Sequence, residues 1–359
     1  MSRISKEEKR QIRSTMDAGQ RREGLRVTTL ALVAICAVFF SFTVGRYSAY
    51  PSDVLRIIWG YVTGVAPDLD PNVELVFFSV RLPRVICAFL VGMGLSVAGC
   101  SYQGVFRNPM VSPDILGATA GAGFGAAIAM LLDFGILGIE LTAFLMGLAA
   151  VGISYLICMI VGKRANLMLT LILAGMVVSA LFQAGISLIK YVADPYTKLP
   201  EIEFWLMGSL ASVNYSDVVK LLIPLLIALI PLYLFRWQLN LLAFSDEEAK
   251  MMGVNITAVR LSIIFSSTLI SSSVVAVSGI IGWVGLVIPH LTRMIVGPNY
   301  KVLIPSCIFL GGAYLLLVDD IARAFMAAEI PLGILTAIVG APFFIILLCQ
   351  KRGGDGDAA

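Results

Sequence analysis

Ten separate runs of apolar residues, each near the length of a membrane-crossing helix, constrain this chain more than any other feature. A helix needs about 20 predominantly apolar residues to cross the hydrocarbon core of a bilayer. Hydrophobic residues make up 58% of the 359 residues and charged residues 14%, against roughly 45–50% and 25% in soluble domains. We therefore predict an all-α, polytopic membrane protein with about ten transmembrane helices. The predicted spans are 27–44, 81–103, 114–132, 137–162, 167–190, 217–236, 256–279, 283–297, 302–325 and 331–350.

The distribution of lysine and arginine predicts the orientation of these helices. With ten spans and a cytoplasmic N-terminus, 18 of the 26 Lys and Arg residues fall on the cytoplasmic side and eight on the outer side. Cytoplasmic loops of membrane proteins carry such an excess. We predict that both termini are cytoplasmic, with a basic N-terminal segment over 1–26, a transmembrane domain over 27–350 and a cytoplasmic tail over 351–359.

Other features of the sequence argue against several functional classes. The formal charge of +3 is too small to suggest a nucleic-acid partner. The apolar composition makes membrane lipid the expected surrounding. No CxxC pair or metal-ligand spacing accompanies the cysteines or His290, and we predict no metal site. No Gly-x-Ser-x-Gly or HExxH motif marks a catalytic residue, and no GxxxxGK[ST] loop marks a nucleotide site. Any use of ATP must therefore depend on a partner.

Residues 245–253 lie in the predicted cytoplasmic loop between the sixth and seventh spans. Ser245 is followed three residues later by Glu248, which is the spacing of a capping box, and Gly253 suits the end of a short helix. Such a helix, if amphipathic, suits docking into a groove on another protein. A solvated connector remains the alternative. The apolar side of this helix would hold Ala249, Met251 and Met252.

Two arginines, Arg81 and Arg84, stand at the predicted outer mouth of the second span. Arginine binds carboxylates through two parallel hydrogen bonds, so this pair could dock an acidic partner from outside. The alternative is that both side chains reach toward lipid phosphates.

Asp319, Asp320 and Arg323 form a charged group near the outer end of the ninth span. Ionisable residues inside a membrane segment are functional candidates. One hypothesis is a proton-coupling carboxylate in a secondary transporter. The other is an Asp319–Arg323 pair at i, i+4 that fixes the end of the helix, and the position near the interface favours this structural interpretation.

Small residues predict where helices approach one another. Gly117, Gly121 and Gly125 recur at helix-contact spacing in the third span, which allows close backbone packing. Segment 198–213 is too short and polar to span but is apolar around Phe204, so we predict a re-entrant or surface helix at the outer interface.

Three motifs in order resemble one family, the permease subunits of type II ABC importers for iron-siderophores, haem and cobalamin. They are RLPRVICAFLVGMGLSVAGCSYQGVFRNPMVSPDILGATAGA (81–122), GWVGLVIPHLTRMIVG (282–297), and the stretch 319–348 with DIAR and EIPLGILTAIVGAPFF. The resemblance covers nearly the whole chain from about residue 27. Small departures are Met110, Ser245 and Asp320, at positions where the family commonly has Leu, Gly and a single acid.

The resemblance implies an inner-membrane permease in a homodimer or pseudo-dimer, with two cytoplasmic ATPase subunits that bind ATP and Mg, and an extracytoplasmic substrate-binding protein. It implies no cofactor and no catalytic residue in this chain. Docking of the binding protein would fall to Arg81, Arg84 and Arg323, and the cytoplasmic gate to Asn108 and Met110. The helix that couples to the ATPase would comprise Ser245, Asp246, Glu247, Glu248, Ala249, Met252 and Gly253.

The cargo implied by the resemblance is a metal chelate, an iron-siderophore in the first place, with haem, cobalamin or an oxyanion as alternatives. Two other functions stay open on the sequence. One is the proton-coupled secondary transporter that uses Asp319 or Asp320, and the other is a membrane scaffold or receptor that transports nothing.

Overall fold

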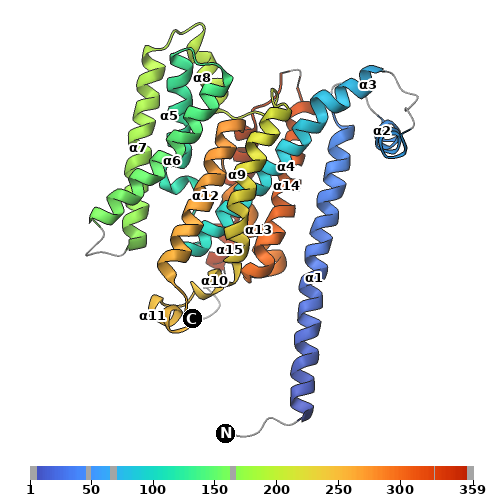
Figure 1. Cartoon of the computed structure of the whole chain (residues 1–359), viewed down its shortest axis with the longest axis vertical. Helices are drawn as coiled ribbons and strands as arrows, with labels where there is room; N and C mark the ends of the chain where they lie inside the picture. The colour runs from blue at the N-terminus through green and yellow to red at the C-terminus, as the bar shows by residue number, and fades with distance from the viewer. Residues whose placement is uncertain (1–5, 46–49, 65–70, 162–166, 327, 354–359) are drawn as a thin grey trace.

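The computed structural model describes residues 6–45, 50–64, 71–161, 167–326 and 328–353, and its regular structure within them is entirely helical (Figure 1). This confirms the predicted all-α class. A π-helical turn over Phe77–Arg81 leads into α4, and a 3-10 turn over Pro113–Leu116 precedes α5. The helices are α1 (Lys6–Thr43), α2 (Pro51–Thr63), α3 (Pro71–Val76), α4 (Leu82–Val105), α5 (Ala118–Leu131), α6 (Ile136–Val161), α7 (Leu167–Val192), α8 (Lys198–Leu206), α9 (Tyr215–Leu234), α10 (Arg236–Leu241), α11 (Asp246–Met251), α12 (Ile256–Ser278), α13 (Val284–Val296), α14 (Tyr300–Ala324) and α15 (Leu332–Gly353).

Within the described residues, seven helices are long and apolar enough to cross a membrane, namely α1, α4, α6, α7, α9, α12 and α14. Three shorter apolar helices, α5, α13 and α15, accompany them. Each of the ten lies at one of the predicted spans, while the number that crosses the bilayer stays a prediction. Outside the described residues lie 1–5 of the predicted N-terminal segment, 354–359 of the predicted tail, and Arg46, Lys163 and Arg164 from the charge count.

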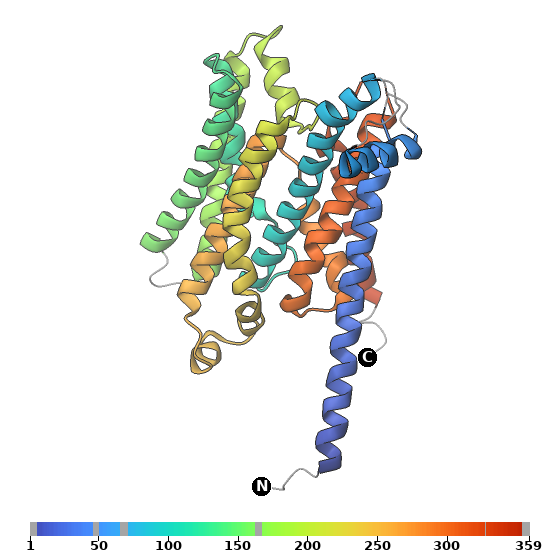
Figure 2. The ribbon, with the colours of Figure 1, turned by 45° about the vertical axis from the view of Figure 1, so that its right-hand side comes forward.

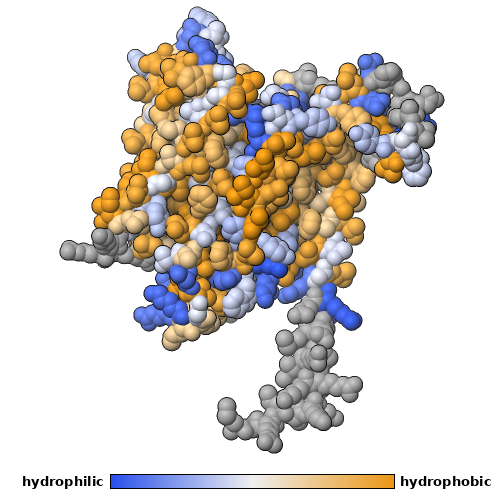
Figure 3. Space-filling view, in the orientation of Figure 1, coloured by the Kyte–Doolittle hydropathy of each residue, from blue (hydrophilic) through white to orange (hydrophobic). Residues whose placement is uncertain are grey.

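The bundle has two polar ends and an apolar middle. The start of α1, the end of α15 and the short helix α11 lie at one end, which we call the lower face (Figure 1). The opposite end, the upper face, carries α3, α8 and the end of α14. Figure 3 shows apolar residues over the middle of the visible side and hydrophilic residues toward both ends. Such a band suits contact with lipid, where helices satisfy their own backbone hydrogen bonds.

Helix α4 forms the centre of the bundle and packs against α9, α12, α13 and α14. In its most apolar stretch, 89% of the residues are buried. Close approach depends on glycine, because a Cβ atom on Gly99 would overlap the carbonyl oxygen of Gly285 on α13. Small residues at contacts between membrane helices permit this kind of packing.

Helices α5 to α8 form a lobe beside this centre (Figure 2). Gly121 and Gly125 of α5 face the backbone of α6, which confirms the predicted packing role for both. Gly117 was wrongly placed inside the helix, because it precedes α5 with φ of +91°; it still packs closely, since a Cβ atom there would lie 3.2 Å from Oγ of Ser179 on α7. Helix α8 occupies the first part of the predicted surface segment 198–213 and buries Ile202.

Candidate functional site

The lower face carries the predicted short helix as α11. Ser245 is its N-cap, with Oγ accepting from the Glu248 amide at 3.2 Å while the Glu248 carboxylate accepts from the Ser245 amide at 2.9 Å. The Ser245 hydroxyl also donates to the Glu248 carboxylate at 2.8 Å, and the bonds that this carboxylate accepts from the Ser245 amide and hydroxyl lower the pKa of Glu248. Gly253 follows the helix with φ of +81°, a left-handed conformation that suits glycine. The predicted capping box is thus confirmed, whereas the coupling role of 245–253 stays a prediction.

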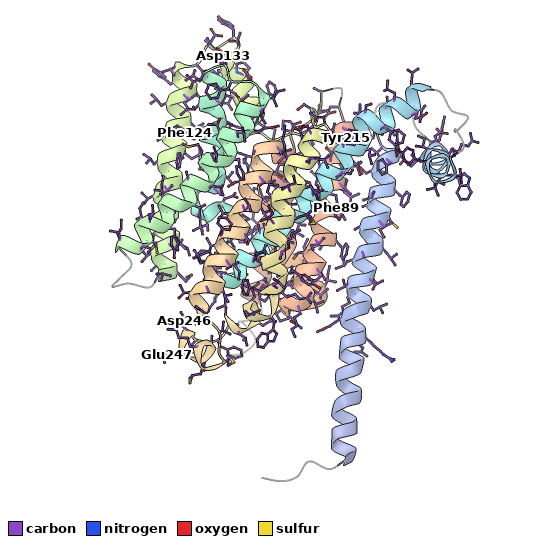
Figure 4. All side chains as sticks on the ribbon, in the orientation of Figure 1. Phe89, Phe124, Asp133, Tyr215, Asp246 and Glu247 are labelled. Atoms are coloured by element: carbon purple, nitrogen blue, oxygen red, sulfur yellow. The ribbon has the colours of Figure 1, made fainter. Side chains whose placement is uncertain are left out.

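Helix α11 turns one apolar residue inward and presents others outward. Ala249 is fully buried, whereas 81% of Met251 and 45% of Met252 are exposed. The preceding Phe244 is also exposed. Glu247 lies with Asp246 at the tip of the lower face (Figure 4). The helix therefore presents flexible methionine side chains beside acidic ones, which suits contact with another protein surface.

One carboxylate ties α11 to two other parts of the molecule. Asp246 accepts two hydrogen bonds from Arg260 of α12, each at 2.8 Å, and one from Arg107 at 2.7 Å. Hydrogen bonds from Arg260, and then from Arg107, hold the pKa of Asp246 below its usual value. Arg107 also donates to the carbonyl oxygen of Leu242. Asp246 therefore links α11 to α12 and to the loop that follows α4.

The predicted gate residues lie immediately after Arg107. The side-chain oxygen of Asn108 accepts from the Met110 amide at 2.9 Å, and the Asn108 amide donates to the Gln103 carbonyl at 3.1 Å. Arg107 itself has φ of +50°. Met110 is exposed on the lower face. The sequence did not indicate that Arg107, in this loop, pairs with Asp246 of α11, because the two residues are 139 positions apart in the chain.

The upper face holds a second cluster, centred on Arg84. Its Nε lies 3.0 and 3.1 Å from the two Asp319 oxygens, and Nη2 lies 2.9 Å from Oδ1. Nη1 and Nη2 also donate to the Glu329 carboxylate at 3.0 and 2.9 Å. The Arg84 side chain is 7% exposed and that of Asp319 is fully buried. Arg84 thus joins the start of α4 to the end of α14 and the loop after it.

Arg323 and Arg81 complete this cluster. Arg323 bonds to Asp320 and, at 2.6 Å, to both the carbonyl and the hydroxyl of Ser41 on α1. Arg81 donates to the carbonyl of Phe42, also on α1. Both arginines are buried. We call the set Arg81, Arg84, Arg323, Asp319, Asp320 and Glu329 the upper ion-pair cluster, and its three cations match its three carboxylates.

The geometry of the upper ion-pair cluster bears on the roles predicted for it. The expected Asp319–Arg323 pair is present at 3.6 Å, but Arg84 and Asp320 make the shorter contacts. Arg84 and Arg323 lie against carboxylates inside the chain and Arg81 lies against the Phe42 carbonyl, so an acidic partner from outside would compete with these groups. Sequence reasoning missed Glu329 and Ser41, since nothing local to either residue pairs it with an arginine.

His290, for which the sequence predicts no metal-binding role, lies with its ring centre 6.4 Å from that of Phe343. In the part of the chain that the structure describes, no three His, Cys, Asp or Glu side chains gather as a metal site would require. The arrangement therefore offers a protein-contact helix and an ion-pair cluster for function.

Comparison with known proteins agrees with this arrangement. The FecCD transport family matches residues 32–350. The molybdate import system permease protein MolB of Haemophilus influenzae is 42% identical over 326 residues, covering 90% of this chain and 96% of MolB. The Fe(3+)-citrate import system permease protein YfmE of Bacillus subtilis is 36% identical over 333 residues, covering 92% and 96%. A solved inward-facing metal-chelate type ABC transporter has a TM-score of 0.80 and 40% identity, covering 90% of this chain and 98% of the other.

Proposed function

This chain belongs to the FecCD transport family and is an ABC importer permease, and on that premise we propose that it moves a metal-containing solute inward with energy from partner ATPase subunits. The observation that supports this most directly is the match along 32–350 to a family whose named relatives are import permeases. The lower face is then cytoplasmic and the upper face extracytoplasmic, in the bacterial inner membrane.

We propose that α11 is the contact with the ATPase. Its cap holds it as a defined helix, and its exposed Met251 and Met252 provide an apolar surface for a groove. Asp246 links it to Arg260 and Arg107, so a push on α11 reaches α12 and the Asn108–Met110 loop together. ATP and Mg would bind to two such ATPase subunits, one for each of two permease copies.

On the extracytoplasmic side, the proposed partner is a substrate-binding protein. The burial of Arg81, Arg84 and Arg323 favours a role in fixing the ends of α1, α4 and α14 together. Direct docking of acidic residues onto these arginines stays a prediction. It requires that a bound partner replaces internal carboxylates, and Glu329, whose side chain is 26% exposed, is the one nearest to solvent.

For the cargo, we propose a metal-containing anion. The named relatives import molybdate and Fe(3+)-citrate, so the class includes both a metal oxyanion and an iron chelate. An iron-siderophore, haem or cobalamin also contains a metal, and each stays an alternative cargo. The cargo would pass between two copies of this chain.

The rival function, proton-coupled transport through Asp319 or Asp320, fits the geometry less well. Both carboxylates are held in ion pairs by arginines near one end of α14, away from the middle of that helix.

Uptake in proteoliposomes separates the two functions. The permease is reconstituted with its ATPase and a loaded binding protein, and uptake of labelled molybdate and ferric citrate is measured with and without ATP. We expect uptake to require ATP, the ATPase and the binding protein, and to persist when an uncoupler dissipates the proton gradient. Uptake without ATPase that collapses with the gradient would overturn the proposal, and absence of flux for every cargo tested would favour a scaffold.

A further inference from the structure

A cationic pocket opens at the lower face, beside the loop of Arg107 and Asn108 described above. It has a volume of about 820 Å³ and lies between the end of α4, α10 and the start of α14. Arg107, Arg293 and Lys301 line it, and none of the described residues in its lining is a carboxylate. Arg107 is partnered by Asp246, which lies outside the lining. Because Asp246 is shared with Arg260, the positive charge of the pocket comes from Arg293 and Lys301 together with part of that of Arg107.

The neutral groups of the pocket suit an anion as well. Arg293 donates to the Gln103 side chain at 3.2 Å, which keeps its guanidinium at the wall of the pocket. Asn240 bonds to Asn299 at 3.1 Å and to the Tyr300 amide at 3.0 Å, so α10 and the start of α14 form one wall. Such a pocket can bind a phosphate group through charge-assisted hydrogen bonds.

A separate apolar groove lies on the outer surface of the bundle, where Leu226 and Ile230 are more than half exposed. It has a volume of about 280 Å³ and lies between Leu226, Ile230 and Tyr233 of α9 and Ile304 and Ile308 of α14. Both helices pack on α4, which lies between them (Figure 2). Tyr233 lies one turn before Trp237 in the pocket, and Ile304 one turn after Tyr300. The two cavities share no lining residue, but each is bounded by α14 and by the stretch of chain that runs from α9 into α10.

Aromatic and basic residues lie where the lining of the groove gives way to the lining of the pocket along the chain. The Arg236 guanidinium stacks 3.7 Å from the centre of the Tyr233 ring, and Lys301 lies 6.0 Å from that of Trp237. Aromatic rings of this kind gather at the headgroup level of membranes. A ligand for both cavities needs an apolar chain and an anionic head joined at this level.

We propose that the cationic pocket and the apolar groove together bind an anionic phospholipid of the cytoplasmic leaflet, with the phosphate near Arg293 and Lys301 and an acyl chain between α9 and α14. Basic pockets between membrane helices on the cytoplasmic side recognise anionic headgroups in this manner. This proposal rests on the proposed function in one respect, that the lower face is cytoplasmic.

Native mass spectrometry of the full chain tests the proposal. The protein in detergent is titrated with phosphatidylglycerol, phosphatidylcholine or glycerol 3-phosphate. We expect preferential binding of phosphatidylglycerol. Lys301→Gln should weaken it about fivefold, the effect of one basic residue worth about 1 kcal/mol near a charged surface. The matched control Lys250→Gln removes the same charge from α11 and should leave the affinity unchanged.

Variants in the groove separate a lipid from a soluble anion. Ile230→Trp fills the groove and should weaken lipid binding, whereas Ile223→Trp, exposed on the same helix outside the groove, should not. Equal binding of the two lipids, equal losses in the two lysine variants, or equal losses in the two isoleucine variants would overturn the proposal. Glycerol 3-phosphate displacing the lipid at equal concentration would reassign the pocket to a soluble phosphate. Loss of bound lipid when the ATPase is added would reassign it to the partner.

Discussion

Removing Arg84 should destabilise the fold more than removing any exposed arginine, because it separates a buried carboxylate from its main partner. In Arg84→Ala, Asp319 stays fully buried and keeps only the Arg323 contact at 3.6 Å. Breaking a buried pair by removing one partner costs about 3–5 kcal/mol. Glu329 adds little to this cost, since its side chain is 26% exposed and can turn to water.

The magnitude follows from the number of bonds lost. Arg84 makes three contacts shorter than 3.2 Å with Asp319 and two with Glu329. Lysine cannot reproduce this planar fork, so Arg84→Lys should lose an intermediate amount. Replacing both partners, as in Arg84→Met with Asp319→Leu, should cost less than Arg84→Ala, because it leaves no buried charge unpaired.

Unfolding of the purified chain in mixed micelles, titrated with dodecyl sulfate and followed by tryptophan fluorescence, measures these differences. The expected order of stability is wild type, then the double variant, then Arg84→Lys, then Arg84→Ala. A loss below about 1 kcal/mol for Arg84→Ala, the range of exposed pairs, would refute the argument that the cluster is structural. A double variant less stable than Arg84→Ala would refute it also.

Three further predictions concern the lower face and the core. Ser245→Ala should cost about 0.5–2 kcal/mol of local helix stability, because the N-cap is lost. It should also reduce the ATP hydrolysis that is coupled to transport, measured in proteoliposomes. Ser245→Asp supplies another good N-cap and should retain this coupling. Since Arg260 depresses the pKa of Asp246, its contribution to stability is present above its unfolded pKa of about 3.9 and disappears as pH falls through the lower folded value. Asp246→Asn should remove that acid-sensitive part of the unfolding profile, and an unchanged profile would contradict the link. Gly99→Ala should sharply lower the yield of folded protein on gel filtration, because the new Cβ meets the Gly285 carbonyl; normal yield would contradict the tight α4–α13 contact.

Features with short-range signals could be predicted from the sequence. The capping box of α11 depends on Ser245 and Glu248, three residues apart, and both its start and its end were found. The long apolar runs likewise located the spans, because hydropathy reports the solvent of a helix directly. Gly117 was misplaced because spacing alone does not say whether a glycine lies inside a helix or in the turn before it.

Features that depend on tertiary packing could not be predicted. Arg84 lies 245 positions before Glu329 in the chain, and no periodic pattern connects residues at that distance. The sequence therefore left two roles open for Arg84, a docking residue or a lipid anchor, whereas the structure buries its side chain inside the bundle. Which residues of α11 are exposed could not be predicted for the same reason. Ala249 and Met251 are both apolar, but only Ala249 is buried.

Asp320, the second of the two adjacent acids before Arg323, has a structural role of its own. Helix α1 stands at the edge of the bundle and packs chiefly on α14. Asp320 accepts from the Ser41 hydroxyl at 2.7 Å and from Arg323, which also bonds the Ser41 carbonyl. Asp319 cannot replace it, because Arg84 already occupies that carboxylate. Two adjacent acids thus serve two different contacts, Asp319 holding α4 and Asp320 holding α1 against the same end of α14.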